Sequence, residues 1–538
     1  MKVFSKKSGY AIRLTMMLFM VGTVIVPLAR MFFYIDVSDF TKIITSNQFL
    51  KALMNSLAVT SVASALSLCI AFILAWCVSR TNILFKNIIS IMLVVPMLIP
   101  SISHSSGLIL LFGTNGLITR AFGLTSNIYG FWGIVSGSIM YSFPVAFLMI
   151  CDILKYEDYS PYEAAQVLGI PMRWQLKDIT FAYLRKPLIS VVFTIFTFIF
   201  TDYGIPITLG GKYITLPVIM YQEVMGQLNF GKGSVIGIML LLPAVISFII
   251  DITNKENSNG KYVIVPYKTS RNKRTNAISY IVCGAGILFI ILVNVAFVIL
   301  AFTKKYPVDL TFTLDNVRKT FALNGRQYLI NSFIISIAVS AIGTFIAFCI
   351  AYLTARTPSL LSKGLHLITI TSLAIPGIVL GLSYVLLFNG NAIYGTIVIL
   401  IIVNIVHFIA TPYLMMYNTL CKINENIEAV GQTLGIKRLL IIKDVFIPQT
   451  KCTLLEMASY LFVNSMITIS AVAFLATTVN KPFSLMINQF DALMIVECSA
   501  VVSLILLAVN ILCKSVVYFL QITFKKRELK LGVNRETV

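Results

Sequence analysis

Long, uninterrupted apolar runs constrain this chain more than any other feature. Two of them, residues 12–34 and 278–302, exceed the roughly 20 apolar residues that a helix needs to cross a bilayer. Only 12% of the 538 residues are charged and 58% are hydrophobic, whereas a soluble protein carries about 25% charged residues. A large soluble core would instead require amphipathic helices with a polar face. The sequence therefore predicts an all-α polytopic membrane protein.

Apolar runs and polar breaks divide the chain into about twelve predicted transmembrane helices. These fall near residues 11–34, 55–79, 87–112, 129–154, 187–205, 233–252, 277–302, 331–355, 364–388, 393–418, 452–478 and 495–522. Six belong to a first half, residues 1–252, and six to a second half, residues 277–523. Segment 253–276 has the polar, basic composition of a cytoplasmic linker, and residues 524–538 form a basic cytoplasmic tail.

The net charge of +21 predicts orientation rather than nucleic-acid binding. Lys and Arg concentrate before the first span, in alternate loops and in the tail, as they do in cytoplasmic loops of membrane proteins. Both termini are therefore predicted to be cytoplasmic, on the same side as segments 155–186 and 420–451. The first apolar run is too long for a signal-peptide core and lacks an obvious cleavage site. Nine scattered cysteines without a CxxC pair imply no disulfide framework.

The two halves repeat each other at one constant offset over their first spans. Pairs of identical residues at this offset are Asn55 and Asn331, Arg80 and Arg356, and Pro100 and Pro376. An even number of spans in each half makes the repeat parallel, related by an axis along the membrane normal. The sequence thus predicts a pseudo-dimer with the transport pathway between its halves.

One short polar loop occurs in both halves, between long apolar runs. Residues 163–170 read Glu-Ala-Ala-Gln-Val-Leu-Gly-Ile, and residues 429–436 read Ala-Val-Gly-Gln-Thr-Leu-Gly-Ile. A Lys-Asp pair follows the glycine in each copy, at 177–178 and at 443–444. The duplication predicts two docking points for a cytoplasmic partner, and an ordinary amphipathic interfacial loop is the alternative.

The residues of the first copy predict a defined local structure. Glu163, Ala164 and Ala165 favour a helix, and the small alanines let another surface approach closely. Gly169 is expected to take the positive φ that ends this helix. Pro171 suits the first turn of a second helix. We expect a rigid L-shaped protrusion on the cytoplasmic face.

Both loops resemble the coupling loop of ATP-binding cassette importer permeases, whose pattern is Glu-Ala-Ala, three residues, Gly, nine residues, Ile, one residue, Leu-Pro. The first copy supplies Glu163, Ala164, Ala165, Gly169 and Ile179. The second supplies Gly435 and Pro448, with Ala429 and Gly431 at the positions of the glutamate and of the second alanine. Span count, loop position and duplication extend the resemblance over nearly the whole chain.

Each copy departs from the pattern in a different place. The first has Phe181-Ala182 where Leu-Pro is expected, and the second has Glu428 one position too early for the motif glutamate. We therefore expect two unequal contacts with the partner. The first loop should be the more sensitive to loss of its glutamate.

The resemblance implies the permease subunit of a type I importer in a bacterial inner membrane. In that family separate ATPase subunits, two of them, dock on the loops, and an extracytoplasmic binding protein delivers the substrate. The chain contains no GxxxxGK[ST] phosphate loop, so it is expected to be neither an enzyme nor dependent on a cofactor. A twelve-span secondary transporter is the alternative, and it would carry coupling carboxylates or unwound helices near the bilayer midplane.

Residues 200–230 resemble permeases for 2-aminoethylphosphonate most, with ferric iron permeases next and thiamine permeases after them. Asp202 is the first candidate for the substrate path, because charges inside a membrane are usually functional; a solvated helix-end carboxylate is the alternative. Tyr203 adjoins it. Ser103 and His104 form a second polar patch, for which hydrogen-bonded packing is the alternative. One histidine without a partner carboxylate is a poor metal site, so no resident metal ion is predicted.

Overall fold

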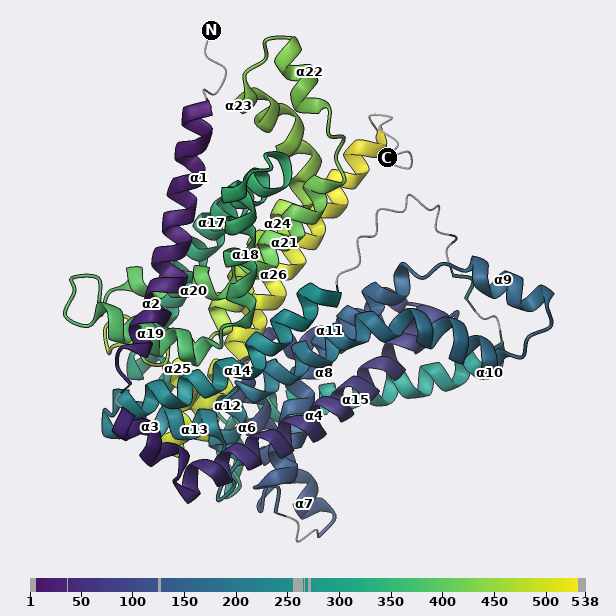
Figure 1. The fold of residues 1–538 in the computed structure, drawn as a ribbon. Helices are drawn as coiled ribbons and strands as arrows, with labels where there is room; N and C mark the ends of the chain where they lie inside the picture. The colour runs from purple at the N-terminus through teal and green to yellow at the C-terminus, as the bar shows by residue number, and fades with distance from the viewer. Residues whose placement is uncertain are drawn as a thin grey trace. The chain divides into compact units, whose positions relative to one another are not determined.

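The computed structural model describes residues 6–35, 37–123, 127–254, 265, 267–269 and 272–530. Helices dominate these residues, and the two short strands among them, β1 (Thr303–Lys305) and β2 (Asp309–Phe312), pair as an antiparallel hairpin. The predicted all-α class is therefore confirmed (Figure 1). Most of the predicted linker and residues 531–538 of the predicted tail lie outside the described residues.

The chain divides into two compact units. Unit 1 contains residues 1–36, 321–486 and 505–538, and unit 2 contains residues 37–320 and 487–504. Each unit thus combines segments from both halves of the sequence.

Unit 2 is built mainly from the first half of the sequence. Its helices are α3 (Val37–Ile44), α4 (Asn47–Arg80), α5 (Lys86–Val94), α6 (Ser101–Phe112), α7 (Leu117–Ala121), α8 (Phe131–Lys155), α9 (Ser160–Val167), α10 (Met172–Gln175), α11 (Phe181–Phe200), α12 (Gly204–Leu209), α13 (Leu216–Tyr221), α14 (Phe230–Asn254), α15 (Lys273–Ala301) and α16 (Asp315–Thr320). Helices α4 and α8 pack along their lengths. A buried hydrogen bond joins them, from Ser142 Oγ to Ser67 Oγ at 2.9 Å, and small polar side chains of this kind hold membrane helices close together.

Unit 1 is built mainly from the second half. Its helices are α1 (Lys6–Met20), α2 (Val26–Phe32), α17 (Arg326–Arg356), α18 (Leu360–Thr371), α19 (Gly377–Phe388), α20 (Ile397–Phe408), α21 (Ala410–Cys421), α22 (Ile427–Thr433), α23 (Arg438–Ile441) and α24 (Ile447–Ile467). Helices α25 (Leu485–Ala492) and α26 (Val496–Lys530) contribute residues to both units. Within unit 1, Ser340 Oγ donates to the carbonyl of Ala458 at 2.8 Å and so ties α17 to α24.

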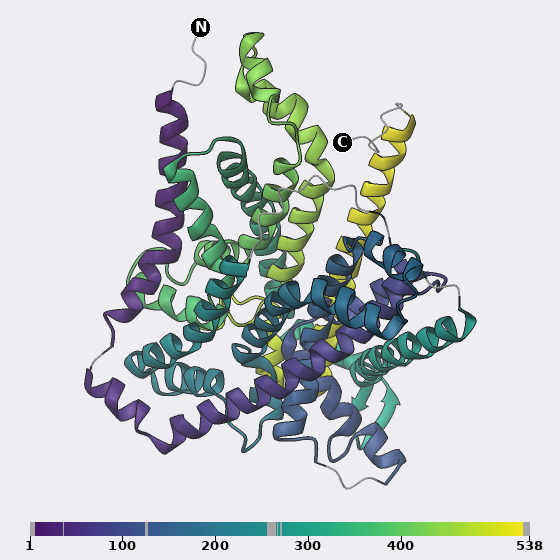
Figure 2. The same cartoon turned by 45° about the vertical axis from the view of Figure 1, so that its right-hand side comes forward.

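The two sequence halves exchange their first helices. Helices α1 and α2 run beside α18 and α19 of unit 1 in both views (Figures 1 and 2), and Tyr384 donates to the carbonyl of Thr23 at 2.8 Å. Helix α15 packs against α4 and α6 of unit 2. Gly107 permits this approach, because a Cβ there would lie 2.7 Å from Val293 of α15. The sequence repeat alone did not indicate this exchange.

Pro100 and Pro376 bend the third predicted span of each half. Helices α5 and α6 meet at 100°, and α18 and α19 meet at 111°. The residue before a proline avoids helical geometry, and Ile99 and Ile375 take extended ψ values of 152° and 115°. The predicted spans 87–112 and 364–388 are therefore each interrupted by a sharp bend.

Seven described helices are long and apolar enough to cross a membrane, or ten if each bent pair counts as one span. The multi-pass class is confirmed, while the count of about twelve stays a prediction. Predicted span 452–478 was too long, because α24 ends at Ile467 and turns follow it. Predicted span 187–205 ends at Phe200, and predicted span 393–418 bends by 50° between α20 and α21.

Candidate functional site

Both repeated loops have the predicted helix-glycine-helix shape. Gly169 follows α9 with φ +68°, and Gly435 follows α22 with φ +70°. The same hydrogen bond closes each helix, from Ile170 N to Ala165 O at 2.9 Å and from Ile436 N to Gly431 O at 2.8 Å. Glycine takes positive φ without steric cost, and this bond satisfies a carbonyl at the helix end. We call segments 155–186 and 420–451 the first and second coupling loops.

The small residues of the motif serve packing within the loop itself. Ala165 and its counterpart Gly431 are both buried. A Cβ added to Gly431 would collide with the Ile441 side chain of α23. Ala164 and Ala429 stay exposed. Only the exposed positions, Ala164 and Ala429, can contact the surface of a partner, so the prediction of close approach by a partner remains for these two alone.

Each coupling loop exposes large apolar side chains at corresponding places. The pairs are Leu168 and Leu434 (74% and 69% exposed), Ile170 and Ile436 (38% and 44%), and Trp174 and Leu440 (47% each). Contiguous exposed apolar surface usually marks an interaction site. Each loop therefore carries a similar exposed apolar surface around its glycine turn, where a partner could dock.

The later motif positions lie where each loop returns to its next long helix. Ile179 is half-buried in a π-type turn over 176–180, and a second π-type turn occupies 442–446. Pro448 is exposed in the first turn of α24, where its missing N–H is not needed. These residues connect the loop to the span that follows it.

An arginine at the end of the first long helix anchors each coupling loop. Arg80 of α4 forms a buried ion pair with Glu157 and donates to the carbonyl of Leu154 at 3.2 Å. Arg356 of α17 binds both carboxylate oxygens of Glu428, from Nε at 2.8 Å and from Nη2 at 2.5 Å. The anchoring carboxylates come from different positions of the two loops, although the arginines correspond.

Described residues of the predicted linker pack on the first coupling loop. Val265 accepts from Tyr159 N at 3.0 Å, and the Tyr267 ring lies 3.7 Å from the Arg80 guanidinium. Lys268 pairs with Glu163. The hydrogen bond to the Glu163 carboxylate raises the pKa of Lys268, so the lysine remains charged at neutral pH.

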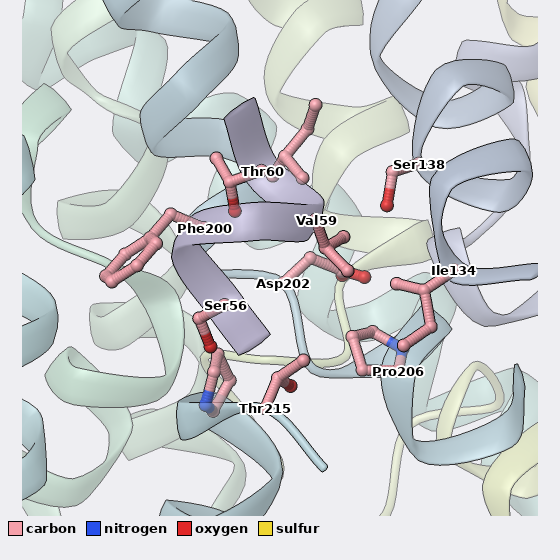
Figure 3. Close-up of a pocket in the computed structure, with 11 residues that line it drawn as sticks. Ser56, Val59, Thr60, Ile134, Ser138, Phe200, Asp202, Pro206 and Thr215 are labelled. Atoms are coloured by element: carbon pink, nitrogen blue, oxygen red, sulfur yellow. The ribbon is translucent and has the colours of Figure 1, made fainter. Parts of the chain in front are cut away.

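Asp202 caps a short helix instead of facing an open path. Its Oδ2 accepts from Ile205 N at 3.0 Å at the start of α12, and its Oδ1 accepts from Ser101 at 2.8 Å. Asp202 lines a cavity of about 10 Å³ with Ser56 and Thr60 (Figure 3), which is room for roughly one water molecule. The position at a helix start agrees with the helix-end alternative, but protein donors rather than open solvent satisfy the carboxylate; a role in the substrate path stays a prediction.

The other predicted path residues are buried among helices of unit 2. Ser103 shares a hydrogen bond of 2.8 Å with Ser503 of α26. His104 packs beside the Tyr141 ring, with centroids 6.2 Å apart. Tyr203 is 1% exposed and accepts from Asn488 of α25 at 3.1 Å. None of these three lines the large cavity described next.

A cavity of about 730 Å³ in unit 2 contains an acidic residue that the sequence analysis missed. Ser106 of α6 donates to Oδ2 of Asp491 at 3.1 Å on its wall. The sequence signal was a single acidic residue between two predicted spans, at 479–494. An isolated carboxylate in a polar connection between spans is not distinctive in the sequence, because such positions are usually solvated.

Comparison with known proteins identifies the same duplication. The family model for the inner membrane component of binding-protein-dependent transport systems matches residues 67–253 and again residues 343–525. Together the two matches cover more than half of the chain.

Several curated proteins are similar over much of this length. A protein of Haemophilus influenzae named as ferric transport system permease FbpB 1 is 26% identical over 481 residues, covering 86% of this chain and 76% of that protein. The ferric transport system permease protein FbpB of Actinobacillus pleuropneumoniae is 26% identical over 463 residues, covering 81% and 66%. The thiamine transport system permease protein ThiP of Haemophilus influenzae is 25% identical over 173 residues, covering 30% and 32%.

The repeated family match agrees with the repeated coupling loops and the apolar helices. This chain belongs to the family of binding-protein-dependent transport system inner membrane components.

Proposed function

We propose that this permease works with separate ATPase subunits, which dock on the two coupling loops, and with an extracytoplasmic binding protein that supplies its cargo. The single observation that carries the proposal is the matching loop geometry, with positive φ at Gly169 and Gly435. The apolar side chains exposed beside each glycine support it, as does the lack of a phosphate loop in the sequence.

The proposal also divides the chain into two permease halves, residues 1–252 and 277–523, which a cytoplasmic linker over 253–276 joins. The two family-model matches, one within each half except at its last residues, support the division. Lys and Arg near both coupling loops and both termini support a cytoplasmic location for all of them.

We propose ferric iron as the cargo. The longer matches are to proteins named for ferric transport, whereas the match to a thiamine permease covers only 30% of this chain. These relatives give no support to 2-aminoethylphosphonate, which the sequence analysis had favoured.

The coupling proposal is tested by the double substitution Gly169→Val and Gly435→Val. A β-branched residue at positive φ is strained by roughly 1–2 kcal/mol, so both turns should distort. A cognate ATPase coexpressed with the permease should then fail to copurify, and ATP-dependent uptake should stop. Gly284→Val is the matched control, because Gly284 lies on α15 with open space around it. Assembly and uptake that survive in the double variant would exclude the coupling role.

The cargo is tested with the complete transporter in proteoliposomes. Radioactive Fe(III) supplied on the cognate binding protein should enter in an ATP-dependent manner. Uptake of 2-aminoethylphosphonate or thiamine, with no uptake of iron, would replace ferric iron as the cargo without changing the coupling proposal.

A further inference from the structure

The cavity of unit 2 is large enough for a small cargo. Its volume of about 730 Å³ falls within the range of roughly 300–1,000 Å³ that is typical of ligand sites. Helices α6, α12, α13 and α25, together with residues 306–307 after β1, contribute side chains to its wall. All of these residues belong to one compact unit.

The wall of this cavity carries negative charge without a balancing cation. Asp491 is the only charged residue among the described residues that line it, and no Lys or Arg is among them. Its Oδ1 is buried, and its neighbour there is the neutral Ser499 hydroxyl, which lies outside normal hydrogen-bond geometry. The chain as a whole has a net charge of +21, so the negative wall of this cavity contrasts with the charge of the rest of the protein. A buried carboxylate without a cationic partner is costly, which points to a cation supplied from outside.

The remaining groups on the wall suit a cation that is held weakly. Tyr129, Tyr221 and Tyr306 present phenol groups, and burial raises the pKa of each, so they stay neutral. The faces of neutral phenol rings attract cations, but this attraction is weaker than binding to a charged phenolate oxygen. No cluster of three or more His, Cys, Asp or Glu suited to a metal ion occurs among the described residues. Weak binding is what transit requires, since the cargo must also leave.

The cavity and the first coupling loop lie at opposite ends of α8. Tyr129, on the cavity wall, precedes the first residue of α8, and the first coupling loop begins where α8 ends at Lys155. A helix of 25 residues is about 37 Å long, which exceeds the hydrocarbon thickness of a bilayer. If the coupling loops are cytoplasmic, the cavity lies at the extracytoplasmic face.

We propose that this cavity is a transit site for the positively charged group of the cargo as it arrives from the binding protein, and that Asp491 is the residue that receives it. The inference rests on the proposed importer function and deepens it. The shared chemistry is a cationic group, which a ferric ion, the ammonium of 2-aminoethylphosphonate and the thiazolium of thiamine all provide. Ser106 is a positioning residue, because it orients the carboxylate through Oδ2.

Direct binding is tested with terbium(III), a hard trivalent cation whose luminescence is excited through nearby tyrosine rings. The full chain in phosphatidylcholine nanodiscs should show a saturable signal. Asp491→Asn should weaken the apparent affinity by about tenfold, and Asp491→Glu should retain most of it. Asp315→Asn is the matched control, because Asp315 is an exposed carboxylate outside the cavity. Equal titrations for wild type and Asp491→Asn would overturn the proposed site.

Cargo identity is separated by competition in the same assay. Displacement of terbium by gallium(III), but not by 2-aminoethylphosphonate or thiamine, supports a metal cargo at this site. Displacement by one of the organic cations instead keeps the site and overturns the assignment of ferric iron.

Transport by the complete complex distinguishes failure of the site from failure of the importer function. Asp491→Asn should raise the KM for delivered cargo by about tenfold while ATPase copurification is unchanged; Ser106→Ala should have a smaller effect in the same direction. Wild-type KM in Asp491→Asn, together with loss of uptake in the Gly169→Val and Gly435→Val double variant, would overturn the transit site alone. Uptake that is insensitive to all of these changes would overturn the transit site and the coupling role of the two loops together, and absence of uptake by the wild-type complex would overturn the importer function.

Discussion

Arg356 donates hydrogen bonds to both carboxylate oxygens of Glu428 and also to the carbonyl of Ile423, the last at 2.8 Å. The arginine side chain is 4% exposed and the glutamate 18%. This geometry explains why the second loop carries its acid one position before the motif glutamate. Glu428 holds the loop to α17, so it is turned toward its own subunit. Glu163 of the first loop is 45% exposed and can meet a partner.

The two glutamates should therefore fail in different assays. Glu428→Gln removes one charge of a largely buried pair, and we expect the permease to lose about 1–3 kcal/mol of stability. Its melting temperature, measured without ATPase, should fall. Glu163→Gln breaks an exposed pair worth about 0–1 kcal/mol, so the melting temperature should hardly change while ATPase affinity drops. A larger loss of melting temperature in Glu163→Gln than in Glu428→Gln would contradict this assignment.

The linker contact predicts that the first coupling loop is restrained more than the second. Tyr267→Ala removes the ring that stacks on Arg80 and contacts Tyr159 and Tyr162, with centroids 5.1 and 5.2 Å away. Hydrogen exchange measured by mass spectrometry should rise in peptides from 156–180. Peptides from 422–446 serve as the internal control, because they have no described linker contact. Unchanged exchange in 156–180 would show that the linker does not restrain the loop.

Removal of the Asp491 charge is predicted to stabilise the folded protein, by an amount that depends on pH. It lies on α25, outside the candidate spans, and burial raises its pKa from 3.8 to about 6, partly offset by the hydroxyls of Ser499 and Ser106. The rise corresponds to about 3 kcal/mol of unfavourable free energy when the carboxylate is charged. The other titratable groups facing it across the cavity are Tyr129, Tyr221 and Tyr306, and Glu497 beside them accepts from Tyr306 N.

Because a raised acid pKa destabilises the folded state at high pH, Asp491→Asn should melt higher than wild type near neutral pH. The difference should shrink as pH falls through about 6 and vanish below the pKa of about 4 in the unfolded chain, where wild type is protonated in both states. The amide oxygen of Asn can still accept from Ser106. A melting temperature below wild type near neutral pH would show that the carboxylate stabilises the fold.

The close contact between Gly431 and Ile441 predicts that a substitution at one position can be compensated by a substitution at the other. Gly431→Ala places a methyl group against Ile441, whose side chain is 6% exposed, and overpacking of this kind costs roughly 1–3 kcal/mol. Thermal unfolding of the isolated permease should show the loss, and the added change Ile441→Val should restore most of it. Ala165, at the corresponding place in the first loop, shows that alanine fits where the neighbour allows it. A double variant no more stable than Gly431→Ala would place the strain elsewhere.

The sequence by itself determined what depends on local chemistry. Apolar runs required membrane helices, and the glycines at 169 and 435 required positive φ at the turn between two short helices. The duplication and the family resemblance followed from the order of residues, and the matches to residues 67–253 and 343–525 confirm both. Pro100 and Pro376 repeat at the constant offset in the sequence, and only the structure shows that they bend the third spans.

Only the tertiary structure decided what depends on residues far apart in the chain. The exchange of α1 and α15, the pairing of Arg356 with Glu428 and the packing of Tyr267 on Arg80 each join segments that no local pattern connects. The same holds for the cavity, where Asp491 meets Ser106 across more than 300 residues of sequence. Asp202 looked functional because it is a charge beside a span, yet backbone and serine donors at a helix start satisfy it. Burial and partners give a carboxylate its role, and both are properties of the folded chain.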